Sequence, residues 1–522
     1  MSKTLVVLVP DYRGDPAILA PLKDLLIRET ALADALWLEF NYRLSPLSNR
    51  DPEGIAEDLN ATIENYVYAH RAEVARIILA GHSMGSTLVR RAFLDASGYG
   101  AKVDRSDVWP GLVTRIVLLG AFGRGFSPDF VPWQKRIWLA PLMRLARTLG
   151  FGGMLRAMLR GADYISRLRI DWVLFNRNEP NQPRVIHLLG TNDPFIRPDD
   201  VIDLEEFPNA TPVRVPGATH SSVAQPGPNT STALIRAFLG ESEADAEVNT
   251  PAEEAQVFFL MHGIRDSREC FQRVAEQLDQ SAPQAKVIVP TYGYLSARRF
   301  LSTRARDNLV PWFVDQISEQ LARNPNATFC YAGHSNGTYI LGEVLRRFPR
   351  LRFERVYLAA SVLPADYPWK PVINTRQQVK RLRCDMGSED WPVGVLCRVL
   401  HRLGKRSLGT GGADGFEYGD RDVIGYNRFT GGHGAMLGAN NTESIADFLL
   451  TDEPLVRTDL QAPAKPSAAF TLLGKFGDVL LPALVALLVA AVVTLTLLLP
   501  APWAWFLLPG VVLLIWIVLG RF

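Results

Sequence analysis

Two short stretches of this sequence have the pattern G-x-S-x-G, in which a serine lies between two glycines. Residues 81–85 read GHSMG and residues 333–337 read GHSNG. A serine on a sharp turn needs neighbours without a Cβ, and such a turn exposes its hydroxyl for attack on a carbonyl carbon. Because the bare pattern occurs by chance in many proteins, its meaning depends on the flanking elements. Ser83 and Ser335 are the candidate nucleophiles that those elements must position.

An apolar strand pattern precedes each serine, and a helical pattern follows it. Arg76–Ala80 leads into the first turn, and Ser86–Ala96 continues from it as a helix. Thr328–Ala332 and Thr338–Arg347 flank the second turn in the same way. A helix that begins at the serine points its free N–H groups toward the site. The amide of Met84 is therefore predicted to stabilise an oxyanion.

With this strand–turn–helix context the first segment resembles the α/β-hydrolase family, whose triad follows the chain order serine, acid, histidine. A strand pattern at Arg184–Gly190 leads to Asp193, where the family places its acid, and residues 217–221 (GATHS) are similar to the family's histidine loop. The resemblance implies that Ser83 is the nucleophile, His220 the base and Asp193 the orienting acid. A capping role for the aspartate and an ordinary loop position for the histidine are the alternatives.

The second segment repeats the same order. Residues 379–387 lead to Asp390, which lines up with the acid of the first segment and is preferred over Asp385. His433 lies between glycines that allow its imidazole to approach Ser335 closely. His401 is the competing histidine, but the apolar-basic pattern around it is typical of a helix surface. The resemblance thus implies a second triad.

The loop after the first strand of each segment supplies the other predicted oxyanion donor. Residues 261–264 read MHGI, the usual family pattern, so the amides of Ile264 and Asn336 are the predicted donors. The second motif set is therefore the more complete one, and if a single half is catalytic we expect the second.

The first segment departs from the family at this loop. Residues 10–14 read PDYRG where the family usually has His-Gly. A backbone donor needs no particular side chain, so the amide of Tyr12 is predicted to act with that of Met84. The carboxylate of Asp11 would be unfavourable beside an oxyanion.

Strand and helix patterns alternate through both segments. Near-continuous apolar strands separated by helices indicate a parallel sheet covered on both faces. The fold class is therefore α/β, with two tandem α/β-hydrolase domains whose mostly parallel sheets are flanked by helices. The predicted strands are 5–9, 36–40, 75–80, 115–119, 184–189 and 212–215 in the first domain, and 257–261, 286–290, 328–332, 355–360 and 379–384 in the second.

Shifts in composition give the domain boundaries. The first domain covers residues 1–240 and the second covers 256–450; an acidic linker at 241–255 joins them, and a proline-containing linker at 451–477 leads to the C-terminal segment 478–522. Residues 121–172 form an insert where the family often carries a cap. A basic amphipathic helix within it would face lipid or, alternatively, pack on its own domain. Its apolar residues are Trp133, Ile137, Trp138, Leu142, Met143, Leu145 and Leu149.

The C-terminal segment predicts a membrane hairpin. Val479–Leu499 is an uncharged apolar run long enough to cross a hydrocarbon core of roughly 30 Å as a helix. After a proline-containing turn, Trp503–Leu519 supplies a second uncharged run, whose length is at the lower limit for a span and which contains Pro509. Lys475 precedes the first run and Arg521 follows the second, so the positive-inside rule puts both chain ends and the two domains in the cytoplasm. We therefore expect a multi-pass membrane protein.

The composition limits which classes of partner and cofactor are expected. The net charge of +2 implies no nucleic-acid partner, and the four cysteines form neither a CxxC pair nor a zinc-ligand pattern. No metal or organic cofactor is expected. The predicted function is a membrane-anchored serine hydrolase that cleaves carboxylic esters of lipid-like or amphiphilic molecules. A thioesterase or amidase would use the same triad, and a membrane-tethered interaction protein with inactive domains is the alternative from another class. The oligomeric state is not predicted.

Overall fold

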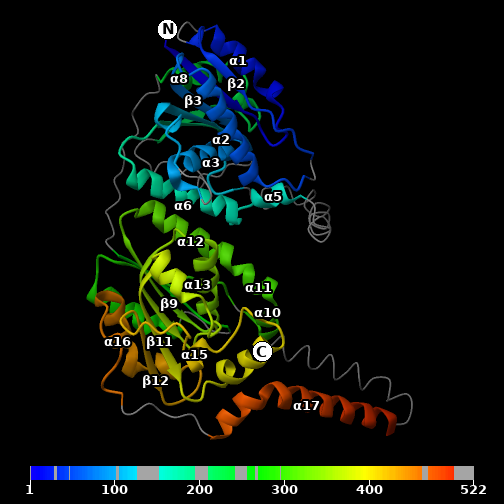
Figure 1. The fold of residues 1–522 in the computed structure, drawn as a ribbon, viewed down its shortest axis with the longest axis vertical. Coiled ribbons are helices and arrows are strands. Elements are labelled where there is room, and N and C mark those ends of the chain that lie inside the picture. Colours follow the sequence, from blue (N-terminus) through cyan, green and yellow to red (C-terminus); the bar gives the residue numbers. More distant parts are fainter. Residues whose placement is uncertain are drawn as a thin grey trace. The chain divides into compact units, whose positions relative to one another are not determined.

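The computed structural model describes residues 2–28, 32–45, 48–100, 105–125, 152–193, 210–240, 256–264, 269–293, 295–460 and 468–498. The chain divides into two compact units (Figure 1). Unit 1 comprises Met1–Ala252 with Val314–Asn326, and unit 2 comprises Glu253–Phe313 with Ala327–Phe522. The division differs from the predicted boundaries in assigning Val314–Asn326 to unit 1. The predicted acidic linker at 241–255 lies outside the described residues.

Unit 1 contains a six-stranded sheet in the order β2-β1-β3-β4-β5-β6, with every neighbouring pair parallel. In the register of the inner strand β1, Leu5 pairs with Leu36 of β2 and with Ile77 of β3. All six strands were predicted to within a few residues at each end. Their bounds are β1 Lys3–Val9, β2 Leu36–Glu39, β3 Val74–His82, β4 Val113–Leu119, β5 Arg184–Gly190 and β6 Ala210–Val215.

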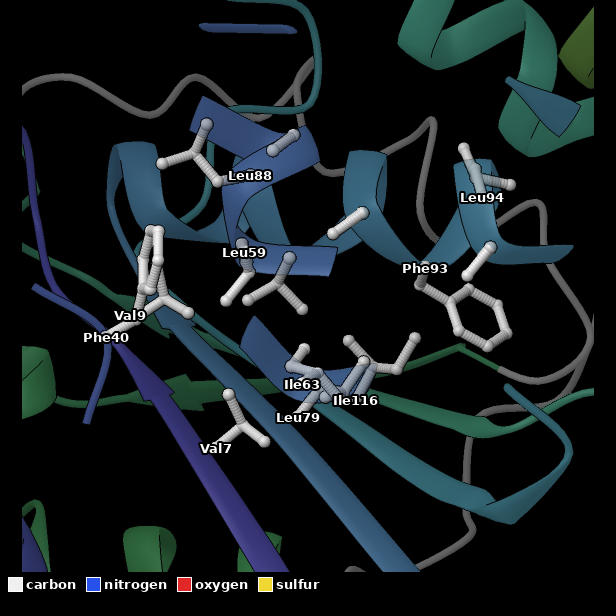
Figure 2. Packing of buried hydrophobic residues seen from close by; sticks show 14 of the residues in the cluster. Val7, Val9, Phe40, Leu59, Ile63, Leu79, Leu88, Phe93, Leu94 and Ile116 are labelled. Carbon is white, nitrogen blue, oxygen red and sulfur yellow. The ribbon is translucent and has the colours of Figure 1, made fainter. Parts of the chain in front are cut away.

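Helices cover both faces of this sheet because its inner strands are apolar on both sides. Alternate residues of β1 contribute to two separate buried clusters, one with Val7 and Val9 and the other with Val6 and Leu8. Figure 2 shows the first cluster, in which Leu59 and Ile63 of α2 approach strand residues such as Leu79. Each fully buried side chain of this kind contributes about 1.5–3 kcal/mol. The covering helices are α2 (Pro52–Ala69), α3 (Met84–Leu94) and α6 (Asp163–Asn178) on this face, and α1 (Ala20–Ile27) and α8 (Ser231–Leu239) on the other.

The predicted cap insert at 121–172 is only partly described. Its proposed amphipathic helix, with Trp133 to Leu149, lies outside the described residues. The C-terminal part of the insert belongs to α6, whose Leu168 and Trp172 are buried in the core of unit 1. This part of the insert packs on α3, where the Trp172 ring lies 6.4 Å from that of Phe93.

Unit 2 has a second six-stranded parallel sheet, in the order β12-β11-β10-β9-β7-β8. Numbered from the start of each unit, both sheets read 2-1-3-4-5-6. Five of the six strands were predicted. Their bounds are β7 Gln256–Met261, β8 Lys286–Ile288, β9 Thr328–His334, β10 Phe353–Ala359, β11 Val379–Gly387 and β12 Ile424–Phe429. Helices α9 (Glu269–Ser281), α13 (Asn336–Arg347) and α16 (Ala439–Thr451) accompany them, and the division between the units falls within α12 (Leu309–Arg323), after Phe313.

Strand β12 is the one strand that the sequence pattern did not predict. It lies at the edge of the sheet and pairs with β11 from Leu382–Ile424 to Gly387–Phe429. Its sequence, IGYNRF, mixes glycine and polar residues with apolar ones and therefore lacks the apolar run of an inner strand.

The segment predicted as the second linker is partly fixed to unit 2. Arg457 donates from its backbone N–H to Asn427 (2.7 Å) and from Nη1 to Asn441 (2.9 Å). Helix α17 (Ala468–Leu498) begins inside the predicted linker, and its first turns pack near the helical turn Pro392–Cys397. These parts of the predicted linker thus have partners that are distant in the sequence.

Among the described residues, none of the helices has the combination of length and apolar character that a membrane crossing needs. The predicted first span, Val479–Leu499, falls largely on α17 and is not supported. Its apolar run continues a helix whose first turns include Lys475, whose backbone carbonyl accepts from Arg402 (3.2 Å). The predicted second span, Trp503–Leu519, lies outside the described residues.

Candidate active sites

The first candidate nucleophile, Ser83, lies between the end of β3 and the start of α3. Its backbone has φ 54° and ψ −117°, a region that residues other than glycine rarely adopt. Its N–H donates to the carbonyl of Leu119 at 2.8 Å, so a bond to the neighbouring strand holds the strained turn in place. Such an enforced turn is typical of a serine presented for nucleophilic attack.

The two glycines of the motif are needed for close backbone contacts. A Cβ on Gly81 would lie 2.5 Å from the carbonyl carbon of Gly85, and a Cβ on Gly85 would lie 2.3 Å from the carbonyl oxygen of Pro10. Any larger residue would push the turn away from the loop that follows β1. The G-x-S-x-G spacing therefore brings that loop and the nucleophile turn together.

The three predicted triad residues of unit 1 form one continuous chain of hydrogen bonds. His220 Nε2 lies 2.8 Å from Ser83 Oγ, and His220 Nδ1 lies 2.8 Å from Asp193 Oδ2. The Asp193 side chain is fully buried, whereas 15% of the His220 side chain is exposed. A serine bonded to an imidazole whose other nitrogen is held by a carboxylate can transfer its proton when it attacks a carbonyl.

A second histidine, His82, supports the loop of the first. Its Nε2 lies 3.0 Å from the backbone carbonyl of His220, and burial lowers the pKa of His82. The neutral ring with its proton on Nε2 can therefore donate to the carbonyl. Sequence reasoning missed this contact, although the presence of histidine at the same position of both motifs was an available signal.

In unit 2, Ser335 lies on an equivalent turn between β9 and α13. Its backbone has φ 51° and ψ −116°, and its N–H donates to Ala359 at 3.0 Å. His433 Nδ1 lies 2.9 Å from Asp390 Oδ1, and His334 Nε2 lies 3.1 Å from the carbonyl of His433. Ser335 and His433 both belong to the described residues, and no hydrogen bond joins them.

The competing acid of unit 2 has a different environment. Both oxygens of Asp385 accept from the Arg383 guanidinium, at 2.9 and 2.8 Å, and both side chains are fully buried. Tyr357, Asn427 and Asn441 donate to the same carboxylate. The structure therefore brings Asp390, and not Asp385, to the predicted histidine.

The competing histidine, His401, also lies elsewhere. It belongs to the short helix α14 (Arg398–Arg402), and its Nδ1 bonds to the carbonyl of Leu408 at 2.6 Å. This is the helix position that its surrounding pattern predicted.

The loops predicted to carry the oxyanion donors follow β1 and β7. In unit 2, Gly263 lies against the nucleophile turn, since a Cβ on it would be 2.9 Å from Ser335 Cβ. Ile264 comes next in that loop, and Asn336 begins α13. In unit 1, Asp11 Oδ1 accepts from the N–H of Arg13 at 3.0 Å.

Tyr12, the residue between Asp11 and Arg13, is the predicted donor of unit 1, together with Met84 at the start of α3. Each of the four predicted donors thus stands in the loop after the first strand of its unit or directly after its serine.

The cysteines take no part in these sites. All four are free, and burial raises the pKa of Cys330 to about 11 and that of Cys397 to about 12, so both remain thiols at neutral pH. Within the described part of the chain, no group of three or more histidine, cysteine, aspartate or glutamate side chains could hold a metal ion.

Residues 2–228, which contain Ser83, Asp193 and His220, match the model of the alpha/beta hydrolase family. No curated protein sequence matches the chain. The family match supports a hydrolase fold of this type for unit 1.

Several solved structures are similar over about one domain. The RedJ thioesterase from the prodiginine biosynthetic pathway of Streptomyces coelicolor is 18% identical and covers 46% of this chain and 86% of its own, with a TM-score of 0.26. The peroxisomal alpha-beta-hydrolase Lpx1 of Saccharomyces cerevisiae is 12% identical, covers 55% and 87%, and has a TM-score of 0.34. A monoacylglycerol lipase of Paleococcus ferrophilus is 17% identical, covers 46% and 97%, and has a TM-score of 0.32.

Proposed function

We propose that this protein is a serine hydrolase that cleaves carboxylic esters through an acyl-enzyme. The observation that carries the proposal is the hydrogen-bonded chain in unit 1, in which His220 lies 2.8 Å from both Ser83 Oγ and Asp193 Oδ2. These three residues are far apart in the sequence. They meet in the order that the transfer of a proton from serine to histidine requires, with the acid on the other nitrogen of the imidazole.

Acylation begins when Ser83 Oγ attacks the ester carbonyl carbon and its proton passes to His220 Nε2. Asp193 holds Nδ1–H and stabilises the imidazolium that forms. The amides of Tyr12 and Met84 stabilise the negative charge that develops on the carbonyl oxygen. The imidazolium then gives its proton to the departing alcohol, which leaves the acyl group on the serine. Water, activated by His220, hydrolyses this ester and regenerates Ser83.

Unit 2 supplies a second site of the same kind, with Ser335, His433 and Asp390 and the amides of Ile264 and Asn336. Its support is the 2.9 Å bond between His433 and Asp390 and the strained turn at Ser335. Catalytic hydrogen bonds are often long before substrate binds, so the missing hydrogen bond between Ser335 and His433 is compatible with activity. The same missing bond favours a binding role for unit 2 as the second candidate.

We infer amphiphilic esters as the substrate class from the surface of α17. Its Leu472, Val479 and Leu487 are 57%, 64% and 70% exposed, which is unusual for large apolar side chains on one helix. An apolar surface on the same chain favours substrates with an apolar tail. The cytoplasmic position of the two units stays a prediction from the charges that flank the C-terminal apolar runs.

The test combines covalent labelling with turnover. A fluorophosphonate probe and p-nitrophenyl esters of graded chain length are applied to the wild type, to Ser83→Ala, to Ser335→Ala and to the double variant. Partial loss in each single variant and complete loss in the double variant support two working sites. A folded wild-type chain that neither labels nor cleaves any ester contradicts the proposal, and thioesters, amides or a binding role then take its place.

A further inference from the structure

One tyrosine in each unit bonds to the loop that follows the first strand. Tyr42, just after β2, lies with its phenol oxygen 2.9 Å from the carbonyl of Pro10 and also donates to the carbonyl of Asp11. Tyr292, just after β8, lies 3.0 Å from the carbonyl of His262 and 2.8 Å from that of Gly263. The two tyrosines therefore occupy equivalent positions, each in the loop that follows the second strand of its unit.

One of the two carbonyls that each tyrosine contacts belongs to the peptide that carries a predicted oxyanion donor. The C=O of Asp11 and the N–H of Tyr12 are parts of one peptide plane, and the C=O of Gly263 shares its plane with the N–H of Ile264. In a trans peptide the two groups point in opposite directions. A hydrogen bond that holds the carbonyl therefore also sets the direction of the N–H.

Each of these carbonyls has a second donor, and this donor differs between the units. The N–H of Gly14 donates to Asp11 O at 2.9 Å, whereas His262 Nδ1 lies 2.8 Å from Gly263 O. The loop sequences, PDYRG and HGI, have little in common. The doubly held peptide and its tyrosine are the features that both loops share.

The surroundings keep the Tyr42 phenol in place as a donor. Gly14 has a positive φ of 69°, and a Cβ on it would lie 2.7 Å from Tyr42 Cδ2, so glycine leaves room for the ring. Burial raises the pKa of Tyr42 well above its usual value, and the charge of Asp11 adds to this effect. The phenol thus keeps its proton at neutral pH.

The Tyr292 phenol connects both predicted donors of unit 2. Asn336 Nδ2 donates to its oxygen at 3.3 Å, which directs the phenol proton toward the two loop carbonyls. The backbone N–H of Asn336 is itself the second predicted donor. The Tyr292 phenol therefore contacts the peptide that carries the Ile264 N–H, through Gly263 O, and the side chain of Asn336, whose backbone N–H is the other donor.

We propose that Tyr42 and Tyr292 are positioning residues that lock the peptides Asp11–Tyr12 and Gly263–Ile264 with their N–H groups directed at the oxyanion. The inference rests on the proposed function. Removal of a complete oxyanion donor typically costs about 10²–10³ in kcat. Here the donor remains but loses one of its two orienting bonds, so a loss of about 10- to 100-fold is expected. KM changes little, because the bond strengthens chiefly in the transition state.

The experiment isolates each site. Tyr42→Phe is measured in a Ser335→Ala chain and Tyr292→Phe in a Ser83→Ala chain, with kcat and KM on p-nitrophenyl esters and the rate of serine labelling by a fluorophosphonate. The control is Tyr367→Phe, which removes a buried phenol that bonds to the carbonyl of Gly342 at 2.7 Å in a part of unit 2 outside the loop. Thermal midpoints are recorded for all variants.

A thionoester of the same acid provides a readout that lost stability alone would not change. Sulfur accepts hydrogen bonds more weakly than oxygen, so an intact oxyanion site prefers the oxygen ester. The proposal expects both Tyr→Phe variants to lose kcat and labelling rate and to show a smaller oxygen-to-sulfur preference, whereas Tyr367→Phe changes neither.

Unchanged kcat and an unchanged preference in a Tyr→Phe variant overturn the inference for that unit while leaving the hydrolase function intact. Equal losses in Tyr367→Phe also overturn it, since they indicate a general structural effect. If the parent chain with the intact serine neither labels nor turns over, the proposed function of that unit fails and the inference falls with it.

Discussion

The two units share a sheet order, a nucleophile turn and an acid–histidine pair, yet only unit 1 joins its serine to its histidine. The turns agree closely, with φ of 54° at Ser83 and 51° at Ser335. The imidazole of His220 bonds to both its serine and its acid, whereas the imidazole of His433 bonds to its acid and not to its serine. The more complete motif set, in unit 2, therefore accompanies the less complete hydrogen-bond chain. Motif completeness and site geometry are separate properties.

The loops that bring acid and histidine together are the same in both units down to single backbone bonds. Asn192 N–H donates to Ala218 O at 2.9 Å, and Glu389 N–H donates to Gly431 O at 2.8 Å. Gly190 and Gly387 allow the same close approach of strand and loop, since a Cβ on either would lie within 2.5 Å of a carbonyl oxygen.

The difference arises at the imidazoles. The Phe122 ring lies 5.1 Å from that of His220, whereas in the described part of unit 2 the ring beside His433 is that of His334, at 4.9 Å. The side chain of His433 is also more exposed, at 25% against 15%. An imidazole beside an apolar ring and nearly closed off from water has fewer competing orientations.

The largest effect should come from the nucleophile of unit 1. In a Ser335→Ala chain, Ser83→Ala should lower kcat by about 10⁶, because no other group can form the acyl-enzyme. The wild type should owe the larger share of its ester turnover to Ser83, as its proton acceptor is already in place. Steady-state kinetics of the two single variants test this, with circular dichroism as the control for folding. A larger loss in Ser335→Ala would reverse the comparison.

Substitution of the triad acids should have the second largest effect on kcat. Asp193→Asn in the Ser335→Ala chain should lower kcat by about 10⁴, because the amide holds the wrong tautomer of His220. Asp390→Asn in the Ser83→Ala chain should act in the same way on unit 2. Esterase kinetics and fluorophosphonate labelling rates measure both. Unchanged kinetics in either variant would remove that residue from its triad.

Asp385→Asn should separate stability from catalysis in unit 2. The change leaves the buried Arg383 without its charged partner, and breaking such a pair typically costs about 3–5 kcal/mol of unfolding free energy. At temperatures well below unfolding, the kinetics at Ser335 should stay close to those of the parent. Urea unfolding measures the first effect. A specific loss of kcat with unchanged stability would instead return Asp385 to the candidate acids.

The smallest predicted effect concerns how the free energy of unfolding depends on pH. It arises at one strand position, where unit 1 has a histidine and unit 2 a cysteine. Burial lowers the pKa of His187 in β5 to about 3, and the equivalent residue of β11 is Cys384, whose pKa burial raises. Between pH 6.5 and 3 the unfolded state binds a proton at His187 and the folded state does not. Stability from this group is therefore complete above pH 6.5 and declines as the pH falls, by about 2 kcal/mol from pH 7 to 5.

Urea unfolding of the wild type and of His187→Leu at pH 7 and pH 5 tests this response. The wild type should lose about 2 kcal/mol more than the variant on acidification. Cys384→Ala is the matched control, and it should follow the wild type over this range because a thiol does not titrate there. Parallel losses in the wild type and His187→Leu would show that His187 does not cause the acid sensitivity.

The sequence by itself determined the features that depend on neighbouring residues. Apolar runs such as that of β1, which are short and rich in β-branched residues, indicate buried strands. The glycines around Ser83 and Ser335 are needed for a turn that joins strand to helix. The order of the motifs along the chain then indicated which loops to compare. Such patterns involve residues close together in the sequence, so they can be recognised without knowledge of the fold.

Only the tertiary structure decided the contacts between distant segments. It chose Asp390 over Asp385 through the buried Arg383, and it added β12, whose polar sequence becomes a strand by pairing with β11. It also left His433 unbonded to Ser335 and placed Tyr42 and Tyr292 on the loop carbonyls. These outcomes depend on side chains that meet across many intervening residues, where differences of less than an ångström decide whether a hydrogen bond forms.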